Sequence, residues 1–447
     1  MSRTFNVVGG GIAGLAAAWE LSSVDGAQVT VHEIGDRWGG KVHTSPFAGR
    51  VVDEGADAFL LRVPDALDLV RELGLEGEVV HPAERTAYLW SRGALRPMPS
   101  RHVLGVPLDL DDLAATGLLD DDELAATRDA YAAPGRAITA DDISVADLVG
   151  GAAGRPVLDR VVAPLLSGIN AGRVDDMSAA ALTPQLLEAG RHPQGLLAGL
   201  AEQQSAADPT APVFGGFAGG TGRLIDRLVE ALDERGVDLR LGDHIRSLGH
   251  LETDGVVLAV PAFAAGDLLA DASPGAAGLL ETIGYASVVV VTLAVPRAAI
   301  GHPLDASGFL VADPEGLLLT ACSWSSTKWA HLGGGDTVVL RASAGSAGDE
   351  RIAHLQDEEL VARLLEDLGR TMELDGAPTA VRVSHWEHSL PQYGVGHLKR
   401  VADIEATLAH EHDAPVVLTG AAYGGVGLPA CIRHARAAAR RLLDAGG

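Results

Sequence analysis

Three consecutive glycines near the N-terminus have the spacing that most clearly predicts chemistry. The short apolar run ending at Val8 leads into Gly9-Gly10-Gly11-Ile12-Ala13-Gly14, a G-x-G-x-x-G that opens a helix-like stretch. Glycines at these positions let the turn close, let the backbone approach a pyrophosphate and let the helix pack on the strand. The free N–H groups at the start of a helix also attract phosphate. The spacing therefore predicts a dinucleotide site.

An acidic residue follows at the distance that a dinucleotide site requires. A second apolar run ends on Glu33, 19 residues after Gly14, where a carboxylate would accept hydrogen bonds from ribose hydroxyls. The alternative is a glycine-rich turn with a surface glutamate. The candidate cofactor-binding residues of this part of the chain are Gly9, Gly11, Ile12, Ala13, Gly14, Glu33 and Ile34.

The elements that must position these residues alternate between strand and helix. Residues 1–45 read β-α-β, and the apolar segments 254–261 and 416–419 predict two further strands, the first of them buried in a parallel sheet. The spacing of leucines over 65–73 predicts a helix that ends at Gly74. A glycine turn over 420–427 is expected to lead into a helix that begins near Pro429.

The middle of the chain has a different character. Residues 103–205 are rich in Ala, Leu and Asp at helical spacing, which predicts a helical insertion with loops near Pro134-Gly135 and over 150–154. The stretch 214–222 predicts a glycine-rich turn before a helix over 223–235. Strand-length apolar pieces at 287–295, 317–321 and 337–341 predict an antiparallel or mixed sheet.

Composition limits the possible partners. A chain of 447 residues is expected to form two or three domains, and 47% apolar residues can fill their cores. The net charge of −26 disfavours nucleic acid and anionic membrane surfaces as partners. No uninterrupted apolar run reaches the roughly 18 residues of a membrane span, so we expect a cytoplasmic protein.

The cysteines and histidines predict neither a metal site nor a catalytic triad. Cys322 and Cys431 are the only cysteines, and their spacing fits no zinc site. We expect both to be reduced and buried. The 16 histidines are scattered without a spacing pattern, so no metal ligand and no catalytic side chain is assigned.

Several longer motifs resemble one family. Arg37-Trp38-Gly39-Gly40 directly after Glu33 resembles the FAD-binding signature of the amine oxidase and protoporphyrinogen oxidase superfamily. The stretches Leu-Pro-Gln-Tyr-x-x-Gly-His at 390–397 and Gly-Val-Gly-Leu-Pro-x-Cys-Ile at 425–432 are more specific. Together with 53–59 and 164–172, they resemble the FAD-dependent coproporphyrinogen III oxidase and protoporphyrinogen oxidase family, in its actinobacterial coproporphyrinogen oxidase form.

The resemblance implies a fold and a division into domains. The fold is α/β, with a Rossmann-like, doubly wound FAD-binding domain, a mixed-sheet substrate domain and a helical insertion. The FAD-binding domain would comprise residues 1–60, 206–262 and 405–447. The substrate domain would comprise 61–100 and 263–404, and the helical domain 101–205.

The resemblance also implies a reaction in heme biosynthesis. Coproporphyrinogen III would be oxidised to coproporphyrin III in three two-electron steps, with FAD as cofactor and O2 as the acceptor that becomes H2O2. The chemistry is centred on the flavin, so no catalytic side chain is needed. We also expect a transient contact with the iron-inserting chelatase. The further implied cofactor-binding residues are Arg37, Gly39, Gly40, Lys41, Gly55, Ala56, Asp57, Val426, Gly427 and Leu428.

A substrate with four propionates needs basic groups on an acidic protein. Arg62 is the first candidate because arginine binds carboxylates bidentately, although it could also be a solvated arginine before a helix. Gly168, Ile169 and Asn170 are expected to form a wall of the substrate cavity, with Ile169 alternatively in the core. Asn170, Val63 and Ala430 depart from the residues usual in the family.

Other functions remain open at this point. The substrate could be protoporphyrinogen IX, which has two propionates. An amine oxidase on the same scaffold would frame its substrate with two aromatic side chains, and only Tyr423 stands near the C-terminal glycine turn. A non-catalytic porphyrin-binding protein would also fit the departures from the family pattern.

Overall fold

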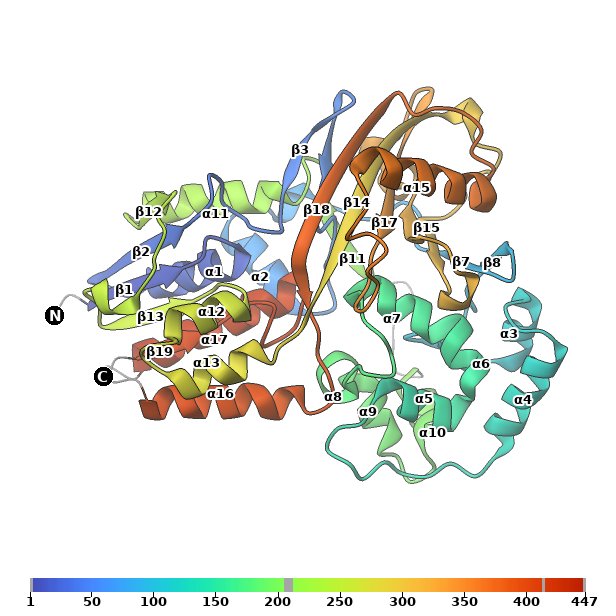
Figure 1. The fold of residues 1–447 in the computed structure, drawn as a ribbon, viewed down its shortest axis with the longest axis horizontal. Helices are drawn as coiled ribbons and strands as arrows, with labels where there is room; N and C mark the ends of the chain where they lie inside the picture. The colour runs from blue at the N-terminus through green and yellow to red at the C-terminus, as the bar shows by residue number, and fades with distance from the viewer. Residues whose placement is uncertain (1–2, 205–211, 412–414, 445–447) are drawn as a thin grey trace. The chain divides into compact units, whose positions relative to one another are not determined.

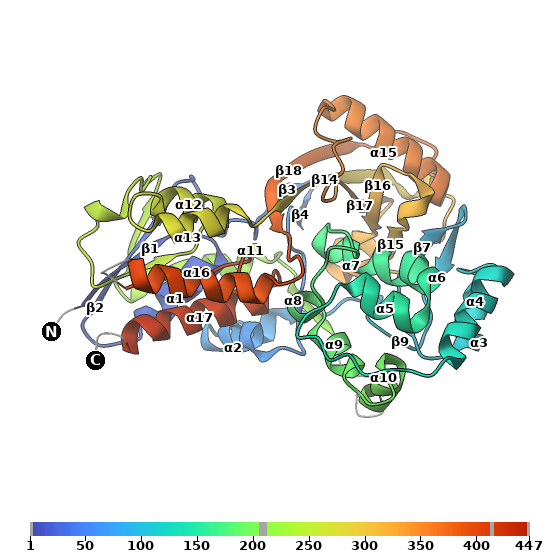
Figure 2. The same cartoon turned by 60° about the horizontal axis from the view of Figure 1, so that its bottom comes forward.

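The computed structural model describes residues 3–204, 212–411 and 415–444, which form two compact units (Figures 1 and 2). Unit 1 comprises residues 1–81, 212–284 and 398–447, and unit 2 comprises 82–211 and 285–397. The predicted boundary at 205–206 lies outside the described residues. The three-part division into functional domains stays a prediction.

A five-stranded parallel sheet forms the centre of unit 1. Its strand order is β12-β2-β1-β13-β19, and every neighbouring pair is parallel. The amide of Ala259 donates to the Val8 carbonyl at 2.8 Å, and that of Thr419 donates to Leu258 at 2.9 Å. The turns that follow β1, β13 and β19 therefore leave the same edge of the sheet. The strands are β1 (Arg3–Val8), β2 (Ala27–Glu33), β12 (Asp238–Leu241), β13 (Gly255–Leu258) and β19 (Val416–Leu418).

Four helices share one apolar core with this sheet. They are α1 (Ile12–Leu21), α2 (Pro64–Glu72), α11 (Gly222–Glu234) and α17 (Leu428–Asp444). Nine of the ten residues of α1 are buried, because α1 packs between the sheet, α11 and α17. The helices predicted at 65–73, 223–235 and from Pro429 are confirmed. Unit 1 further contains α12 (Ala262–Leu269), α13 (Pro274–Glu281) and α16 (His397–Glu411), whose first residue belongs to unit 2.

The glycine-rich stretch at 214–222 contains a strand that the sequence did not predict. β11 (Phe214–Phe217) pairs with β5 (Phe59–Leu60) and β6 (Val79–Val80), so the prediction of a turn throughout is wrong. Phe217 is buried and its ring lies 5.9 Å from that of Phe59. The packing of Phe217 against Phe59 outweighs the weak strand propensity of Gly215 and Gly216. A second hairpin joins β3 (Thr44–Phe47) and β4 (Arg50–Asp53).

Unit 2 is built on a seven-stranded mixed sheet of order β18-β14-β17-β16-β15-β7-β8, as predicted for the region 285–341. Only the β15–β7 pair is parallel. Helix α15 (Asp357–Met372) shares an apolar core with this sheet (Figure 2). The strands are β7 (Tyr88–Ser91), β8 (Ala94–Pro97), β14 (Tyr285–Pro296), β15 (Gly308–Val311), β16 (Leu319–Ser323), β17 (Thr337–Ala344) and β18 (Ala380–Pro391).

The other part of unit 2 is helical, as predicted for 103–205, after a short hairpin of β9 (His102–Val103) and β10 (Val106–Pro107). The loop predicted over 150–154 is wrong, because α5 continues to Ala153 and only Gly154, at φ 90°, ends it. Buried Val149 and Ala153 keep this stretch helical. The helices of this part are α3 (Leu110–Thr116), α4 (Asp121–Ala132), α5 (Val145–Ala153), α6 (Arg155–Val157), α7 (Ala163–Asn170), α8 (Ala179–Leu182), α9 (Pro184–Gly190) and α10 (Leu196–Gln204). The short helix α14 (Ser325–Lys328) lies in the connection between β16 and β17 of the sheet.

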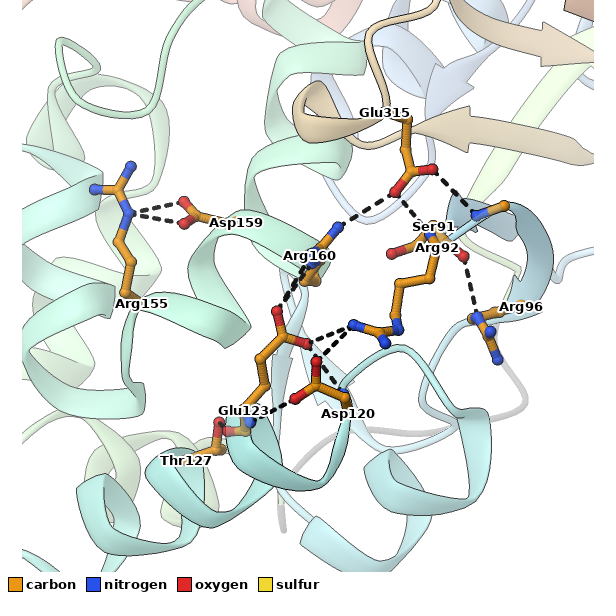
Figure 3. A network of polar contacts seen from close by, with 11 residues as sticks. Ser91, Arg92, Arg96, Asp120, Glu123, Thr127, Arg155, Asp159, Arg160 and Glu315 are labelled. Atoms are coloured by element: carbon orange, nitrogen blue, oxygen red, sulfur yellow. Dashed lines mark hydrogen bonds and ion pairs between the residues drawn. The ribbon is translucent and has the colours of Figure 1, made fainter.

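A π-helical segment, Leu158–Val162, joins α6 to α7. Arg160 in this segment forms ion pairs with Glu123 of α4 at 3.3 Å and with Glu315 at 3.2 Å (Figure 3). Arg92, in the turn between β7 and β8, also pairs with Glu123 and donates its backbone N–H to Glu315 at 2.6 Å. This network ties α4, the π-helical segment and the hairpin to one another.

Candidate functional site

The G-x-G-x-x-G turn is shaped by two glycines that no other residue could replace. Gly9 has φ 108°, and a Cβ there would lie 2.6 Å from the Ala259 carbonyl oxygen. A Cβ at Gly14 would lie 1.8 Å from the Gly9 oxygen, so α1 packs directly on the end of β1. At Gly11, by contrast, a Cβ would meet nothing within 4 Å. The turn is therefore closed toward the protein and open at Gly11. Ile12 and Ala13 are buried in α1.

Glu33 lies at the end of β2 and faces this turn. One carboxylate oxygen accepts from the Gly10 amide and the other from the Gly35 amide, both at 2.7 Å. An ionised carboxylate can accept about four hydrogen bonds, so capacity for further donors remains. The neighbouring Ile34 is 63% exposed, which is unusual for its size, and offers an apolar surface beside the carboxylate.

The R-x-G-G segment folds back onto the first turn. The Gly39 amide donates to the Gly10 carbonyl at 2.8 Å, and Gly11 and Gly39 form a parallel bridge. The Nη1 atom of Arg37 is buried and has no hydrogen-bond partner among the described residues. A buried guanidinium nitrogen without a partner is costly, so this atom indicates an anionic group of a ligand. Gly40 is exposed beside Gly11.

Lys41 connects the R-x-G-G segment to the start of α17. Lys41 is exposed as a residue, yet partial desolvation by the surrounding protein lowers the pKa of its ammonium, and the electrostatic interaction with Cys431 acts in the opposite direction. Burial raises the pKa of the Cys431 thiol to about 11, so the thiol is protonated at neutral pH. Both cysteines are free and buried, as predicted.

The segment Gly55–Asp57 is held by a buried carboxyl group that precedes it. An Asp53 oxygen accepts from the Thr44 hydroxyl at 2.5 Å and from the amide and hydroxyl of Thr221 at 2.8 Å. The Thr221 hydroxyl also lies 2.7 Å from the Ala56 carbonyl. Burial raises the pKa of Asp53 above its usual value, the Thr44 bond opposes this, and Asp57 adds to it.

The C-terminal glycine turn leads directly into α17. Gly425 has φ 122°, Val426 is half-buried and Gly427 is exposed. The Cys431 amide donates to the Gly427 carbonyl at 3.0 Å, which closes the first helical turn, and Leu428 is buried against the unit 1 core. Because β19 and β1 end at the same edge of the sheet, this turn and the first glycine turn leave from one edge. All of the predicted cofactor-binding residues lie in unit 1, and their contact with the cofactor stays a prediction.

The predicted substrate-binding residues divide between the units. Arg62, in unit 1, is exposed and forms no ion pair or hydrogen bond within the described part of the chain. In unit 2, Gly168 is exposed at the end of α7, and Ile169 is 53% exposed, so the alternative that Ile169 is a core residue is wrong. Asn170 is buried, and its carbonyl accepts from the Gln392 side chain at 3.0 Å.

Sequence reasoning missed two features of this site, the Asp53 network and His434. Asp53, Thr44 and Thr221 act together only because a hairpin and the start of α11 meet. Thr221 precedes α11 but does not cap it, since its amide and hydroxyl bond to Asp53, so the helix pattern held no signal for this contact. His434, on α17, was passed over with the scattered histidines, although it packs against the C-terminal glycine turn.

The geometry of unit 1, a parallel sheet with two glycine turns and an acid at one edge, defines a dinucleotide-binding protein. Comparison with known proteins narrows this class. The family pattern described as flavin containing amine oxidoreductase matches residues 12–443, and the chain belongs to this family.

Curated relatives match over nearly their full length. The coproporphyrinogen III oxidase of Mycobacterium bovis is 34% identical, with 99% of this chain and 98% of the relative covered. That of Bacillus subtilis is 32% identical, with 97% and 96% covered.

Solved structures share the fold. A protein from Exiguobacterium sp. 255-15, assigned as a protoporphyrinogen oxidase, has a TM-score of 0.89 at 30% identity, with 99% of each chain covered. A putrescine oxidase has a TM-score of 0.67 at 19% identity, with 99% of each chain covered, which shows a common fold alone.

FAD is the cofactor of this family, and the residues present fit it. The fit rests on the open space at Gly11 and on the buried Nη1 of Arg37, which lacks a partner among the described residues. Within residues 3–204, 212–411 and 415–444, no helix is both long and apolar enough to cross a membrane.

Proposed function

We propose that the protein oxidises coproporphyrinogen III to coproporphyrin III in three successive two-electron steps, with O2 as acceptor and H2O2 as by-product. The observation that carries the proposal is the similarity to coproporphyrinogen III oxidases at 32–34% identity over nearly the whole of both chains. When bound, FAD supplies the two-electron oxidation of the meso carbons and passes the electrons to O2. The protein itself must bind FAD, orient its ring system and hold the porphyrinogen against it.

The first task is to hold FAD. The Gly9–Gly14 turn and the start of α1 would offer backbone N–H groups to the pyrophosphate, with Gly11 leaving room for close approach. Arg37 Nη1 would donate to a phosphate oxygen and so gain the partner it lacks. Glu33 would accept from the ribose hydroxyls, and exposed Ile34 would cover the adenine.

The second task is to orient the ring system. Gly39, Gly40 and Lys41 would lie along the cofactor where the second turn meets the first. Gly55, Ala56 and Asp57 would lie beside the isoalloxazine ring, held by the Asp53 network. Val426, Gly427 and Leu428 would face the N1 and O2 edge. Negative charge on that edge would be stabilised by the N-terminus of α17, whose first turn contains no acidic residue.

The third task is to place an anionic macrocycle on a protein of net charge −26. Arg62 supports the proposal because it is exposed and has no partner among the described residues, so it can receive a propionate without breaking an existing ion pair. Gly168, Ile169 and Asn170 would form part of the cavity wall, with the Asn170 backbone fixed by Gln392.

Two of the alternatives can be compared with specific observations. Tyr423, the aromatic residue near the C-terminal turn, is 2% exposed, so its ring is not available to frame an amine beside the flavin. Similarity to the chloroplastic protoporphyrinogen oxidase of rice, at 26% identity, keeps protoporphyrinogen IX as the second candidate substrate. Because that substrate has two propionates instead of four, it offers fewer carboxylates for Arg62 to bind.

The proposal includes the setting of the reaction. We place the activity in the cytoplasm, with transfer of the porphyrin to an iron-inserting chelatase through a transient contact. The acidic character of the chain supports a partner with a basic surface.

The experiment that tests the function is the growth of porphyrin fluorescence in air. Protein loaded with FAD is given coproporphyrinogen III and protoporphyrinogen IX in parallel, and H2O2 is measured alongside. Faster growth with coproporphyrinogen III, with three H2O2 per porphyrin, is expected. Equal or greater activity with protoporphyrinogen IX would reassign the substrate. No porphyrin from either, while FAD stays bound, would refute the function.

A further inference from the structure

His434 lies beneath the glycine turn that is proposed to face the flavin. It belongs to α17, one helical turn beyond Cys431, so both side chains project from the same face of the helix. A Cβ placed on Gly424 would lie 2.6 Å from the His434 Cδ2 atom and 2.7 Å from Cγ. The imidazole ring therefore packs directly against the backbone of the turn.

The ring is fixed from two further sides. Thr419, the fully buried residue that follows β19, has its hydroxyl 3.2 Å from His434 Nδ1. The ring of Tyr423 is stacked at 6.2 Å between centroids, with 21° between the planes. His434 is thus held by the strand that ends at the turn while it supports the turn itself.

The state of the ring suits a packing role. Burial, together with the positive charges of Arg441 and Arg433, lowers the pKa of His434 to about 4. The imidazole is therefore neutral at physiological pH, and one of its nitrogens can be shared with Thr419 without bringing a charge into the core. Cys431 adds a second support, with its thiol 3.5 Å from the Gly425 carbonyl.

We propose that His434 is a positioning residue for the flavin, because its ring supports Gly424 and thereby sets the path of Val426 and Gly427 past the N1 and O2 edge. The inference rests on the proposed contact of that turn with FAD. His434 does not touch the cofactor; it acts through the backbone in front of it. A displaced turn changes the interactions with the reduced ring more than those with the oxidised ring, since the negative charge arises on reduction.

The test compares His434→Ala, Gly424→Ala and the double variant in the full-length holoenzyme. His434→Ala is expected to weaken FAD about tenfold and to change the ratio of affinities for oxidised and reduced FAD by up to tenfold. That change corresponds to about 30 mV in the two-electron potential. Gly424→Ala is expected to weaken FAD at least as much, because its methyl group meets the ring. In the double variant the methyl group occupies the vacated space, so FAD should bind more tightly than to Gly424→Ala alone.

Controls separate positioning from stability. His250→Ala, at an exposed histidine of unit 1, should change neither affinity nor potential. His434→Phe keeps a ring against Gly424 and loses the Thr419 bond, so it should bind FAD within about threefold of the wild type. If His434→Ala does not fold, Gly424→Ala carries the test, because its methyl group displaces the turn from the ring, and unchanged FAD affinity and potential in that variant would overturn the proposal.

Two results would overturn the proposal. One is that His434→Ala lowers thermal stability but leaves FAD affinity, the flavin spectrum and the potential unchanged. The other is that the effects of the substitutions at 424 and 434 on the free energy of FAD binding are additive. None of these readouts requires porphyrinogen, so a protein that binds FAD but does not oxidise coproporphyrinogen III would refute only the proposed function. A wild-type protein that does not bind FAD would overturn both.

Discussion

Replacing Gly11 with alanine should affect the stability of the apoprotein and its affinity for FAD in opposite directions. Gly11 precedes α1 with φ −72° and ψ 174°, an extended conformation that alanine adopts without strain. The added Cβ meets nothing within 4 Å. Because alanine also restricts the unfolded chain, the free energy of unfolding of the apoprotein should rise by about 0.4–1 kcal/mol.

The same methyl group would stand where the pyrophosphate must approach. Losing one charge-assisted hydrogen bond between a backbone N–H and a phosphate oxygen costs about 1.5–3 kcal/mol. At 1.4 kcal/mol per tenfold, FAD should bind roughly 10- to 150-fold more weakly. The expected result is therefore a protein that is slightly more stable and binds its cofactor poorly.

Calorimetric titration of the apoprotein with FAD and urea unfolding without FAD measure the two quantities. Gly278→Ala is the matched control, since Gly278 is exposed in α13 with nothing near its Cβ position, and it should gain about 0.5–1 kcal/mol with unchanged affinity. Gly14→Ala should instead destabilise the apoprotein, because its Cβ would meet the Gly9 oxygen. Tight FAD binding by Gly11→Ala would refute the assignment of this turn to the pyrophosphate.

Three further predictions concern charge. Arg62→Gln should raise KM for coproporphyrinogen III about tenfold with little change in kcat. The control is Arg246→Gln, at another arginine with no partner among the described residues, which should leave KM unchanged. Equal KM values for Arg62→Gln and the wild type would exclude Arg62 as an anchor. Because the pKa of His434 is lowered to about 4, its stabilising effect is complete above pH 6.5 and is lost as the pH falls toward 4, by at most about 3 kcal/mol. Urea unfolding of wild type and His434→Gln over this range should therefore converge at low pH, and parallel curves would contradict the shift. Arg160→Met should lower the free energy of unfolding in urea by about 1–3 kcal/mol, because the mostly buried Glu315 carboxylate loses a donor. Adding Glu315→Gln should recover part of this loss, and no recovery would mean that the ion pair is unimportant.

The parts of the fold that follow from local pattern were predictable. The strand predicted within 254–261 is buried inside a parallel sheet, so its sequence is continuously apolar and easy to recognise. The strand predicted at 416–419 is the partly buried edge strand of the same sheet, and its short apolar run was sufficient to find it. The first glycine turn was predictable because its G-x-G-x-x-G spacing follows an apolar run and opens a helix, a pattern that is read from neighbouring residues alone. The last turn of α5, residues 150–153, was not predictable, because its two glycines suggested a loop while the burial that keeps it helical comes from distant residues.

The less predictable parts of the site depend on contacts between distant segments. The unpartnered Nη1 of Arg37 is a property of the folded backbone around it and not of its motif. His434 supports Gly424 only because the turn between β19 and α17 reverses the chain over the ring. Likewise, Asp53 is recognisable as a buried acid only once Thr221 is known to lie beside it.

The order in which the sheet of unit 1 is assembled constrains how the protein is made. The first strand, β1, pairs with β13 through Phe5 and Gly255, and α1 packs against α17, which follows more than 400 residues later. At a synthesis rate of about 5–20 residues per second, the glycine turn waits roughly 20–90 s for α17. Unit 2, whose second segment ends at His397, can close earlier. The first glycine turn of the nascent chain is therefore expected to lack its packing partner α17 during most of synthesis. Stable binding of FAD is expected to begin only once α17 has been made.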